Sequence, residues 1–510
     1  MSNIKLASAN IFERFQTSYK NQLDKTFLAL PQGQNYSFGD IDELSGRIAT
    51  QLLTLDVLPD DRVLAQTDKT PATLALYLAT LRIGAIFVPL NTAYTNSEIA
   101  YFMGDAQPKI FFCNAPQYDN LKLIAEQQGV AHTYILGNTE KKHFWKKACG
   151  CSPYTEVIPR DPLDIAAFLY TSGTTGHPKA AMLSHENLSS NALTLHSLWQ
   201  FQPNDVLLHA LPIFHVHGLF VALHCALLNA STLVYLPKYQ PQAVRNALKQ
   251  ATVMMGVPTY YKRLLDIPEF NQDDCKNLRL FISGSAPMTE QLHQEWTKRT
   301  GTQILERYGM TEAGMISSNP YQGERIAGTV GYSLPQVQVR IADKKGNALA
   351  HDQVGVIETK GPNLFKGYWN MPEKTAQEFR SDGFFITGDL GRMAQDGRIS
   401  ILGREKDLII SGGYNIYPKE IEKLLDQHPD IEESVVIGAP QSDLGECVIA
   451  LVVTNSERHI DAQNIEQFIS SKLAKFKQPK KYLYIDELPK NAMGKVQKNI
   501  LRQRYADTFQ

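Results

Sequence analysis

The chain has 510 residues, of which 43% are hydrophobic and 20% are charged, and its formal net charge is −1 at pH 7. This length exceeds what one hydrophobic core supports, so we expect two or more domains, and the composition excludes an intrinsically disordered protein. The near-zero net charge argues against a protein that binds nucleic acid by bulk electrostatics.

The N-terminal segment carries no recognisable secretion signal. Residues 1–12 are mildly amphipathic but lack a signal-peptide apolar core, and no apolar run in the chain reaches the length of a membrane span. The six cysteines are sparse and show no zinc-ligand spacing, so we expect reduced, structural thiols. A cytoplasmic location is the default expectation.

The first 160 residues alternate between helix and strand patterns. Apolar residues recur at helical spacing over 41–53 and 71–84, whereas 61–65 and 85–89 are short apolar runs typical of strands. Strands separated by helices predict a parallel sheet. We expect the Lys/His/Trp-rich stretch 141–147 to be a solvated loop.

A loop of small and hydroxylated residues follows a buried strand expected at 165–170. Its backbone N–H groups can form an anion nest, its glycines leave room for a bulky anion, and its lysine is suited to phosphate. Polyphosphate binding is the natural interpretation, although the spacing differs from the common nucleotide loop. A flexible surface turn is the alternative. The loop residues concerned are Thr171, Ser172, Gly173, Thr174, Thr175, Gly176 and Lys179.

Two histidines, His215 and His217, follow another buried strand expected at 205–211. Their spacing could ligate a metal, but no third ligand cluster accompanies them. The strand–helix alternation then continues to a strand at 278–282, which ends in the small-residue turn 283–287. Such turns at the ends of parallel strands are where open α/β sheets bind ligands.

The heptapeptide Glu306-Arg-Tyr-Gly-Met-Thr-Glu312 combines an aromatic ring, a hydroxyl and a carboxylate. An aromatic face gives flat apolar contact, a hydroxyl donates to phosphate, and a carboxylate binds a hard cation. Taken alone, the heptapeptide could instead be a helix cap.

The last third of the chain changes pattern. Short alternating strands with Gly and Asp turns over 328–361 predict a small antiparallel barrel. Asp389 could accept both ribose hydroxyl protons or could simply stabilise a turn. Residues 403–414 mark a domain boundary, after which mixed patterns predict a small α+β domain. Lys495 lies near its end and would be an ordinary surface lysine outside this context.

In their order and spacing these motifs resemble the acyl-adenylate-forming superfamily, which includes acyl-CoA synthetases, peptide-synthetase adenylation domains and beetle luciferases. The resemblance spans nearly the whole chain. It implies an α/β fold whose large N-terminal domain, 1–405, holds two α/β subdomains with parallel sheets plus a small β-barrel. It also implies a smaller, mobile α+β C-terminal domain, 406–510, with a hinge near Lys406.

The resemblance also implies residue roles. Tyr308 would stack on adenine, Thr311 would meet the α-phosphate, and Glu312 would hold Mg²⁺. His215 would line the acyl pocket, and Lys495 would be the catalytic lysine of adenylation. Further nucleotide or CoA contacts would come from the loop at 171–179 and from Gly284, Ser285, Ala286, Gly309, Met310, Asp389, Arg404, Lys406, Gly412 and Gly413.

The implied reaction uses ATP, Mg²⁺ and CoA in two halves. A carboxylate first attacks the α-phosphate of ATP, giving acyl-AMP and pyrophosphate while positive groups shield the phosphates. The C-terminal domain then rotates about Lys406, the Gly412–Gly413 turn replaces Lys495, and the CoA thiol attacks acyl-AMP. Ala180 stands where many relatives have glycine, a change small enough that we expect function to survive.

Among the superfamily, the chain most resembles malonyl-CoA synthetases, through residues 212–220, 281–287, 306–312, 361–369 and 474–481. Malonate or methylmalonate would bring a second carboxylate that must be neutralised, and arginine is its best partner. Arg307 is the preferred anchor and Arg279 the alternative, although both could pair with local acids such as Glu306. Val216, Met310 and Met315 would limit substituents on the middle carbon.

Three other functions share parts of this pattern. The first is a synthetase for another short or medium-chain acid, which needs no buried arginine. The second is a free-standing adenylation enzyme that loads a carrier protein, which CoA-dependent turnover would separate from a CoA ligase. The third is a nucleotide-binding regulatory or scaffold protein, which loss of Lys495 or Glu312 would favour, and both residues are present.

Overall fold

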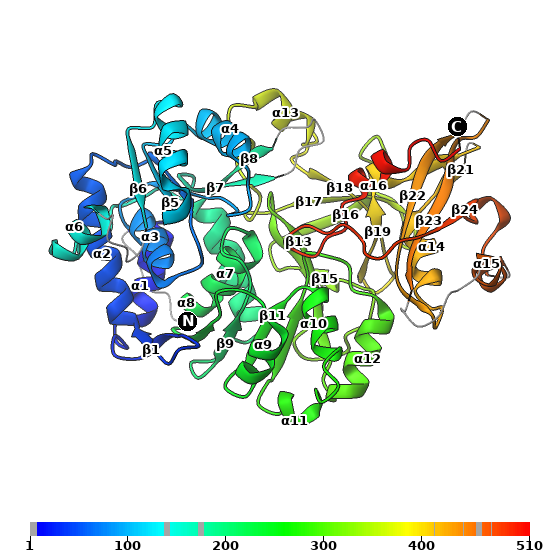
Figure 1. The fold of residues 1–510 in the computed structure, drawn as a ribbon, viewed down its shortest axis with the longest axis horizontal. Helices are drawn as coiled ribbons and strands as arrows, with labels where there is room; N and C mark the ends of the chain where they lie inside the picture. The colour runs from blue at the N-terminus through cyan, green and yellow to red at the C-terminus, as the bar shows by residue number, and fades with distance from the viewer. Residues whose placement is uncertain are drawn as a thin grey trace.

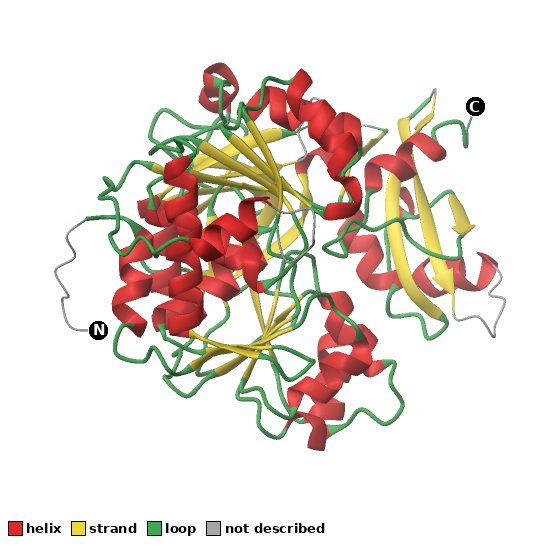
Figure 2. Cartoon of the chain, turned by 60° about the vertical axis from the view of Figure 1, so that its left-hand side comes forward, coloured by secondary structure: helices red, strands yellow, loops and turns green. Residues whose placement is uncertain are grey.

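The computed structural model describes residues 8–136, 143–171, 178–412, 414–441, 443–454, 462–470 and 472–509. The predicted phosphate-loop residues Ser172, Gly173, Thr174, Thr175 and Gly176, together with Gly413, lie outside these ranges. A large N-terminal domain of layered sheets and helices carries a smaller C-terminal domain on one side, as predicted (Figures 1 and 2). In the described part of the chain, no helix is long and apolar enough to cross a membrane.

The first sheet has six strands in the order β6-β5-β3-β4-β7-β8, and all its pairs are parallel except β7–β8. Its strands are β3 (Arg62–Gln66), β4 (Ile86–Pro89), β5 (Ile110–Cys113), β6 (His132–Ile135), β7 (Ile165–Thr171) and β8 (Lys179–Ser184). The central strands are buried because helices cover both faces of a parallel sheet. The predicted phosphate loop therefore connects the two strands of an antiparallel hairpin.

The helices of this region begin where the sequence offers caps. Thr70 caps α3 and is followed by Pro71 at the first helical position. The helices are α2 (Phe38–Thr54), α3 (Pro71–Arg82), α4 (Asn96–Ala106), α5 (Tyr118–Gln127) and α6 (His143–Gly150). The last of these corrects the prediction of a loop at 141–147, because Phe144 and Ala148 pack into the core at helical spacing.

The second sheet has nine strands in the order β15-β14-β13-β12-β11-β9-β10-β1-β2, with a parallel centre and antiparallel edges. They are β1 (Thr26–Ala29), β2 (Asn35–Ser37), β9 (Val206–His209), β10 (Thr232–Tyr235), β11 (Val253–Gly256), β12 (Leu280–Ser283), β13 (Ile304–Met310), β14 (Gly314–Ser318) and β15 (Tyr332–Ser333). The accompanying helices are α1 (Ile11–Tyr19), α7 (His185–Leu198), α8 (Leu223–Leu228), α9 (Pro241–Leu248), α10 (Pro258–Leu265), α11 (Gln272–Cys275) and α12 (Glu290–Thr300). One continuous apolar core joins this sheet to the first.

The expected barrel is a four-stranded antiparallel sheet in the order β16-β17-β18-β19. Its strands are β16 (Gln338–Ala342), β17 (Gly355–Lys360), β18 (Phe385–Met393) and β19 (Ile399–Arg404), and α13 (Pro372–Gln377) lies between β17 and β18. Antiparallel pairing was predicted correctly, but in the described residues β16 and β19 remain edges. So few strands form an open layer rather than a closed barrel.

The C-terminal domain is a five-stranded sheet in the order β21-β20-β23-β22, with β24 added beside β23. Its elements are β20 (Ile409–Ser411), β21 (Tyr414–Ile416), α14 (Pro418–Leu425), β22 (Ile431–Gln441), β23 (Gly445–Thr454), α15 (Ala462–Ser470), β24 (Lys481–Tyr484) and α16 (Lys498–Arg504). Separate apolar clusters cover its two faces, so it has its own core. A single 3-10 turn, Glu405–Asp407, links it to β19.

The segment between β24 and α16 reaches from the C-terminal domain to the N-terminal domain, as the red trace beside β13 shows (Figure 1). Met493 on this segment is part of the N-terminal core, and a Cβ added at Gly494 would lie 2.8 Å from Thr259 Oγ1. Lys423 on α14 pairs with Glu290 on α12 at 2.8 Å across the same interface. These contacts define one orientation of the C-terminal domain.

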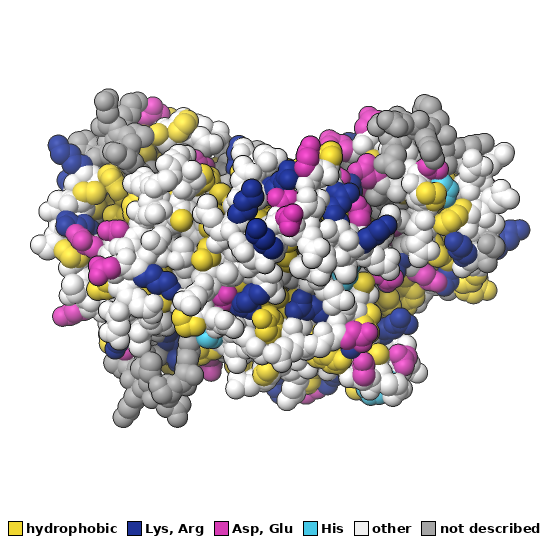
Figure 3. Space-filling view, turned by 90° about the horizontal axis from the view of Figure 1, so that it is seen from below, with side chains coloured by type: hydrophobic (Ala, Val, Ile, Leu, Met, Phe, Trp, Pro, Cys, Tyr) yellow, Lys and Arg dark blue, Asp and Glu magenta, His cyan; other side chains and the backbone are white. Residues whose placement is uncertain are grey.

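The surface carries charges of both signs. On the face shown in Figure 3, basic and acidic side chains lie interspersed among the described residues rather than segregated into a stripe of one sign. That distribution agrees with the net charge of −1. It does not provide the basic footprint that phosphate-backbone binding requires on that face.

Candidate active site

Residues from several segments meet at the carboxyl ends of β9, β12 and β13. After β9 the chain enters a π-helical turn, His217–Ala222, an irregularity that is frequent at functional sites. After β12, Ser285 adopts a left-handed backbone conformation with φ of 70°. Backbone strain of this kind persists where the surrounding structure fixes it, and it clusters at ligand sites.

Arg307 on β13 lies inside this region and is 3% exposed. A Cβ added at Gly284 would come 2.5 Å from the Arg307 Cζ, so only glycine leaves room for the guanidinium there. Among the described residues, Nε and Nη2 of Arg307 have no hydrogen-bond partner. Burial lowers the pKa of Arg307 to about 9. The site thus contains a buried cation with no anion bound to it by the residues that the structure describes.

Two histidines stand beside this cation. The His217 N–H donates to His215 Nδ1 at 3.2 Å, and His217 Nδ1 lies 3.2 Å from Ser285 Oγ. Burial, followed by the charges of Arg307 and Lys495, lowers the pKa of His215 to about 4. Both imidazoles are therefore neutral at pH 7 and leave the positive charge of Arg307 uncompensated. In the described residues, no three His, Cys, Asp or Glu side chains cluster as a metal site.

The structure excludes Arg279 as the anchor. Arg279 precedes β12, at the opposite end of the strand from Gly284, and its guanidinium binds Asp205 through Nε at 2.8 Å and Nη2 at 2.5 Å. It also donates to the carbonyls of Trp199 and Gln200. The prediction failed because it placed Arg279 near the site by sequence distance, whereas the length of the strand separates them.

Glu306 does not neutralise Arg307, because successive residues of a strand point to opposite faces. Its Oε1 accepts from the Gly328 N–H at 3.2 Å, on the side where Lys423 and Glu290 lie. Burial raises the pKa of Glu306 to about 8. The expected alternative, in which Arg307 pairs with this local acid, is therefore wrong.

The raised pKa of Glu306 predicts a pH-dependent stability. Between pH 4.5 and about 8, folded Glu306 keeps a proton that the unfolded chain releases, so stability falls as pH rises through this window. Glu306→Gln keeps the acceptor oxygen without the charge, and we expect it to gain on the order of 3 kcal/mol over the wild type by pH 8.5. Denaturant melts of both proteins from pH 5 to 8.5 measure this; a constant gap between the two curves would contradict it.

A second group of side chains lies toward the β18–β19 sheet. The Tyr308 hydroxyl donates to Asp389 Oδ2 at 2.5 Å, and Asp389 Oδ1 binds Arg404 Nε at 2.8 Å. Arg404 also donates to the Thr387 carbonyl at 2.9 Å. Tyr308, Asp389 and Arg404, predicted separately as adenine and ribose contacts, thus form one connected network.

Glu312 and Lys179 form a third group, next to the end of β8. Glu312 is 6% exposed, its Oε1 accepts from the Tyr368 hydroxyl at 3.0 Å, and burial raises its pKa. Lys179 lies over the Tyr368 ring at 4.0 Å and is 3.6 Å from Glu378 Oε1. Tyr368 and Glu378 were missed from sequence; only the Gly-Tyr-Trp motif at 367–369 hinted at the first.

The remaining predicted residues can be located on the strands and turns of the described chain. Thr171 pairs with Lys179 at the ends of β7 and β8, and Thr311 lies in the turn between β13 and β14. Val216 and Met315 are buried, whereas Ser285, Ala286 and Met310 are partly exposed. A Cβ added at Gly309 would lie 2.5 Å from Met315 Cε, so the two are in contact.

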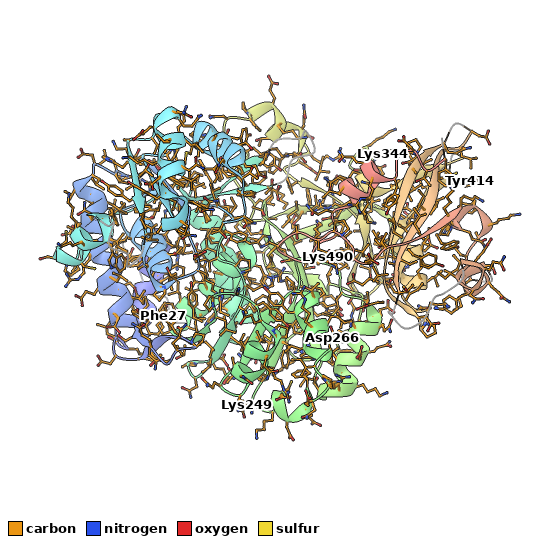
Figure 4. All side chains as sticks on the ribbon, viewed as in Figure 1. Phe27, Lys249, Asp266, Lys344, Tyr414 and Lys490 are labelled. Carbon is orange, nitrogen blue, oxygen red and sulfur yellow. The ribbon has the colours of Figure 1, made fainter. Side chains whose placement is uncertain are left out.

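Lys495 approaches this site from the C-terminal domain. Burial, then Arg404, lowers its pKa, while Asp389 raises it. Lys406, in the turn between the domains, also lowers the pKa of Lys495, so the two predicted lysines lie near each other while Lys495 lies near the Asp389–Arg404 pair. Gly412, by contrast, contacts Leu444 within its own domain. Tyr414, on the next strand, is 57% exposed and lies at the outer side of the C-terminal domain (Figure 4).

Comparisons with known proteins agree with this arrangement. A family model described as AMP-binding enzyme matches residues 15–369, and one described as AMP-binding enzyme C-terminal domain matches 420–495. A malonate–CoA ligase of Arabidopsis thaliana is 32% identical over 97% of this chain and 89% of its own length. A long-chain-fatty-acid–CoA ligase of Bacillus subtilis is 34% identical over 94% of this chain and 91% of its own length.

Solved structures of MatB from Rhodopseudomonas palustris are 47% identical and cover 99% of this chain and 100% of theirs. The TM-score is 0.96 with the ATP-bound form and 0.83 with the apo form. Because the sequence identity is the same, the overall arrangement here follows the ATP-bound form, in keeping with the position of Lys495. The fold, the site and both matched domains lead to one conclusion: this chain belongs to the family of AMP-binding enzymes.

Proposed function

We propose that the protein is an AMP-forming malonate–CoA ligase, which converts malonate, ATP and CoA to malonyl-CoA, AMP and pyrophosphate. The observation that carries the choice of acid is Arg307, a buried guanidinium beside two neutral histidines, with two nitrogens that have no partner within the described ranges. A buried ion without a partner costs several kcal/mol, and a bound carboxylate recovers that cost through charge-assisted hydrogen bonds.

The cost of leaving Arg307 unpaired also provides the selectivity between acids. An acid with an alkyl tail would place methyl groups against the Arg307 guanidinium and leave it unpaired. A three-carbon dicarboxylate can place one carboxylate at Arg307 while the other points toward Lys495 and the phosphates. Val216 and Met315, both buried, would restrict the middle carbon. These contacts favour malonate over the short or medium monocarboxylic acids of the alternative function.

We assign the first half-reaction to groups that already face one another. Lys495 would bring positive charge to the α-phosphate, Lys179 to the outer phosphates, and Asp389 would hold the ribose. Glu312 and Thr311 supply hard oxygen donors, which fit Mg²⁺ together with phosphate oxygens. When bound there, Mg²⁺ would neutralise phosphate charge. Ser172 to Gly176, by sequence, would complete the phosphate cradle.

The second half-reaction requires another orientation of the C-terminal domain. In the present one, Lys495 faces the site, whereas Tyr414 of β21 lies at the outer side of that domain (Figure 4). Rotation about the 405–407 turn would withdraw Lys495 and bring Gly412 and Gly413 to the acyl-AMP, where the CoA thiol attacks. The Lys423–Glu290 pair would break in that step.

The test is AMP release with Mg·ATP and CoA, supplied with malonate, methylmalonate, succinate, acetate, propionate or octanoate in turn. We expect strong preference for malonate, with methylmalonate second. Turnover restricted to monocarboxylates would overturn the malonate assignment. Acid-dependent pyrophosphate exchange without any CoA-dependent turnover would indicate a carrier-loading enzyme instead.

A further inference from the structure

Lys69 is a buried lysine outside the groups assigned above, and burial lowers its pKa well below the usual value. It follows β3 of the first sheet, is 8% exposed, and lies over the Tyr235 ring at 4.5 Å. Its Nζ binds His209 twice, at 2.7 Å from Nδ1 and 2.7 Å from the carbonyl oxygen. These partners, all neutral, belong to β9 and β10 of the second sheet, so Lys69 links the two sheets without forming an ion pair to any residue that the structure describes.

The turn that carries Lys69 is fixed by its own hydrogen bonds. Thr73 Oγ1 donates to the Asp68 carbonyl at 2.6 Å, and the Asp68 N–H donates to Asn114 Oδ1 at 3.1 Å. Thr70 caps α3 immediately afterwards. These hydrogen bonds hold the backbone from which the Lys69 side chain reaches His209.

The contacts of His209 define its tautomer. Its Nε2 lies 2.9 Å from the Gly218 carbonyl oxygen, which can only accept, so Nε2 carries the proton. Nδ1 is then an acceptor, and the Lys69 amino group is its donor. The chain Lys69–His209–Gly218 connects the end of β3 to the end of the turn that bears His215 and His217.

Gly218 is where that turn closes. A Cβ added at Gly218 would fall 2.1 Å from the Pro212 carbonyl oxygen, so the two ends of the 212–218 turn are in close contact. His215 and His217, within this closed turn, lie close enough to Arg307 for its charge to lower the pKa of both, and Val216 is buried between them in the sequence. A shift of the Gly218 carbonyl would move all three side chains of the acyl pocket.

We propose that Lys69 is a positioning residue for the acid substrate: by donating to His209 Nδ1 it fixes the histidine tautomer that fastens Gly218 and thereby holds the 212–218 turn against Arg307. This inference rests on the proposed function. It assigns no chemistry to Lys69 itself, which touches neither substrate nor phosphate.

Lys69→Met keeps the length of the side chain and removes its hydrogen bonds. We expect the KM for malonate to rise about 10- to 100-fold, as for a buried acceptor left without its donor, with the KM for ATP within about two-fold of wild type. Lys25→Met is the matched control, because Lys25 also donates to two carbonyls, those of Pro203 and Ala230, but at the opposite end of the second sheet. It should leave both KM values unchanged.

The tautomer of His209 gives a second readout, which would stay unchanged if Lys69 had a purely structural role. In protein labelled with ¹⁵N-histidine, His209 Nδ1 should resonate as an unprotonated nitrogen, and Lys69→Met should change that signal. His209→Gln should raise the KM for malonate similarly, and the double variant should be no worse than either single one. Additive effects, or an unchanged KM in Lys69→Met, would overturn the proposal.

Failure of the proposed function would give other results than failure of the positioning role of Lys69. If the wild type does not use malonate, the malonate assignment falls, whereas the ¹⁵N signals of His209 still test whether Lys69 sets its tautomer. An unchanged His209 signal in Lys69→Met would overturn the positioning role even in a fully active malonate ligase.

Discussion

Lys495→Ala is expected to lower acyl-AMP formation by about 10²- to 10³-fold while leaving thioester formation from supplied acyl-AMP within a few-fold of wild type. The reason is geometric. Lys495 faces the Asp389–Arg404 pair in the orientation observed, and it would leave the site when the C-terminal domain rotates for the second half-reaction. Malonate-dependent pyrophosphate exchange measures the first half, and thioester formation from malonyl-AMP and CoA measures the second.

Lys490→Ala is the matched control for this experiment. Lys490 lies on the same segment (Figure 4), but its Nζ pairs with Glu433 of its own domain at 2.5 Å. We expect both half-reactions to survive this change. Equal loss of both half-reactions in Lys495→Ala would contradict the division of roles between two domain orientations.

Arg307→Met should lower the activity with malonate and, at the same time, raise the stability of the ligand-free protein. Loss of Arg307 leaves the distal carboxylate of malonate buried without a partner, at a cost of about 3 to 5 kcal/mol, which corresponds to a fall of about 10²- to 10⁴-fold in kcat/KM for malonate. The kcat/KM for propionate should stay level or rise. The ligand-free protein should become more stable, because a buried cation with no partner among the described residues is replaced by an apolar side chain.

Arg279→Met is the control, because we expect it to lower stability and to leave the selectivity between acids unchanged. Arg279 pairs with buried Asp205 and keeps 20% of its own side chain exposed, so its loss should cost stability, by about 3 kcal/mol at most. The malonate-to-propionate ratio should not change. Denaturant unfolding and kcat/KM for both acids, measured on the two variants, test this pair of predictions. A parallel fall in both activities in Arg307→Met would place the anchor elsewhere.

Most of the fold follows from local patterns in the sequence. The runs 61–65 and 85–89 and the helix over 71–84 correspond to β3, β4 and α3 within one or two residues, because apolar periodicity and a capped Pro71 determine them locally. Strand β8 was not predicted, since its pairing with β7 depends on a loop that reverses the chain. The open β16–β19 sheet likewise depends on which edges meet, which local periodicity does not record.

The sequence likewise predicts one part of the candidate site and not the other. Contiguous motifs such as Glu306–Glu312 identify chemistry, but they do not give direction. Whether Arg307 or Arg279 enters the pocket depends on which end of a strand each occupies, and whether Glu306 faces Arg307 depends on strand alternation. Contacts between distant segments were also beyond the sequence; Tyr368 against Glu312 and Lys69 against His209 are joined only by the packing of separate layers.

The most direct test of the central claim is a competition reaction in which the wild-type enzyme receives Mg·ATP, CoA and an equimolar mixture of malonate, succinate, acetate and propionate, followed by mass spectrometry of the acyl-CoA products. Product ratios in such a mixture report the kcat/KM of each acid under identical conditions. If Arg307 anchors a distal carboxylate, malonyl-CoA should be the dominant product. Predominance of acetyl-CoA or propionyl-CoA would contradict the account, because it would show that the acyl pocket does not select for a second charge.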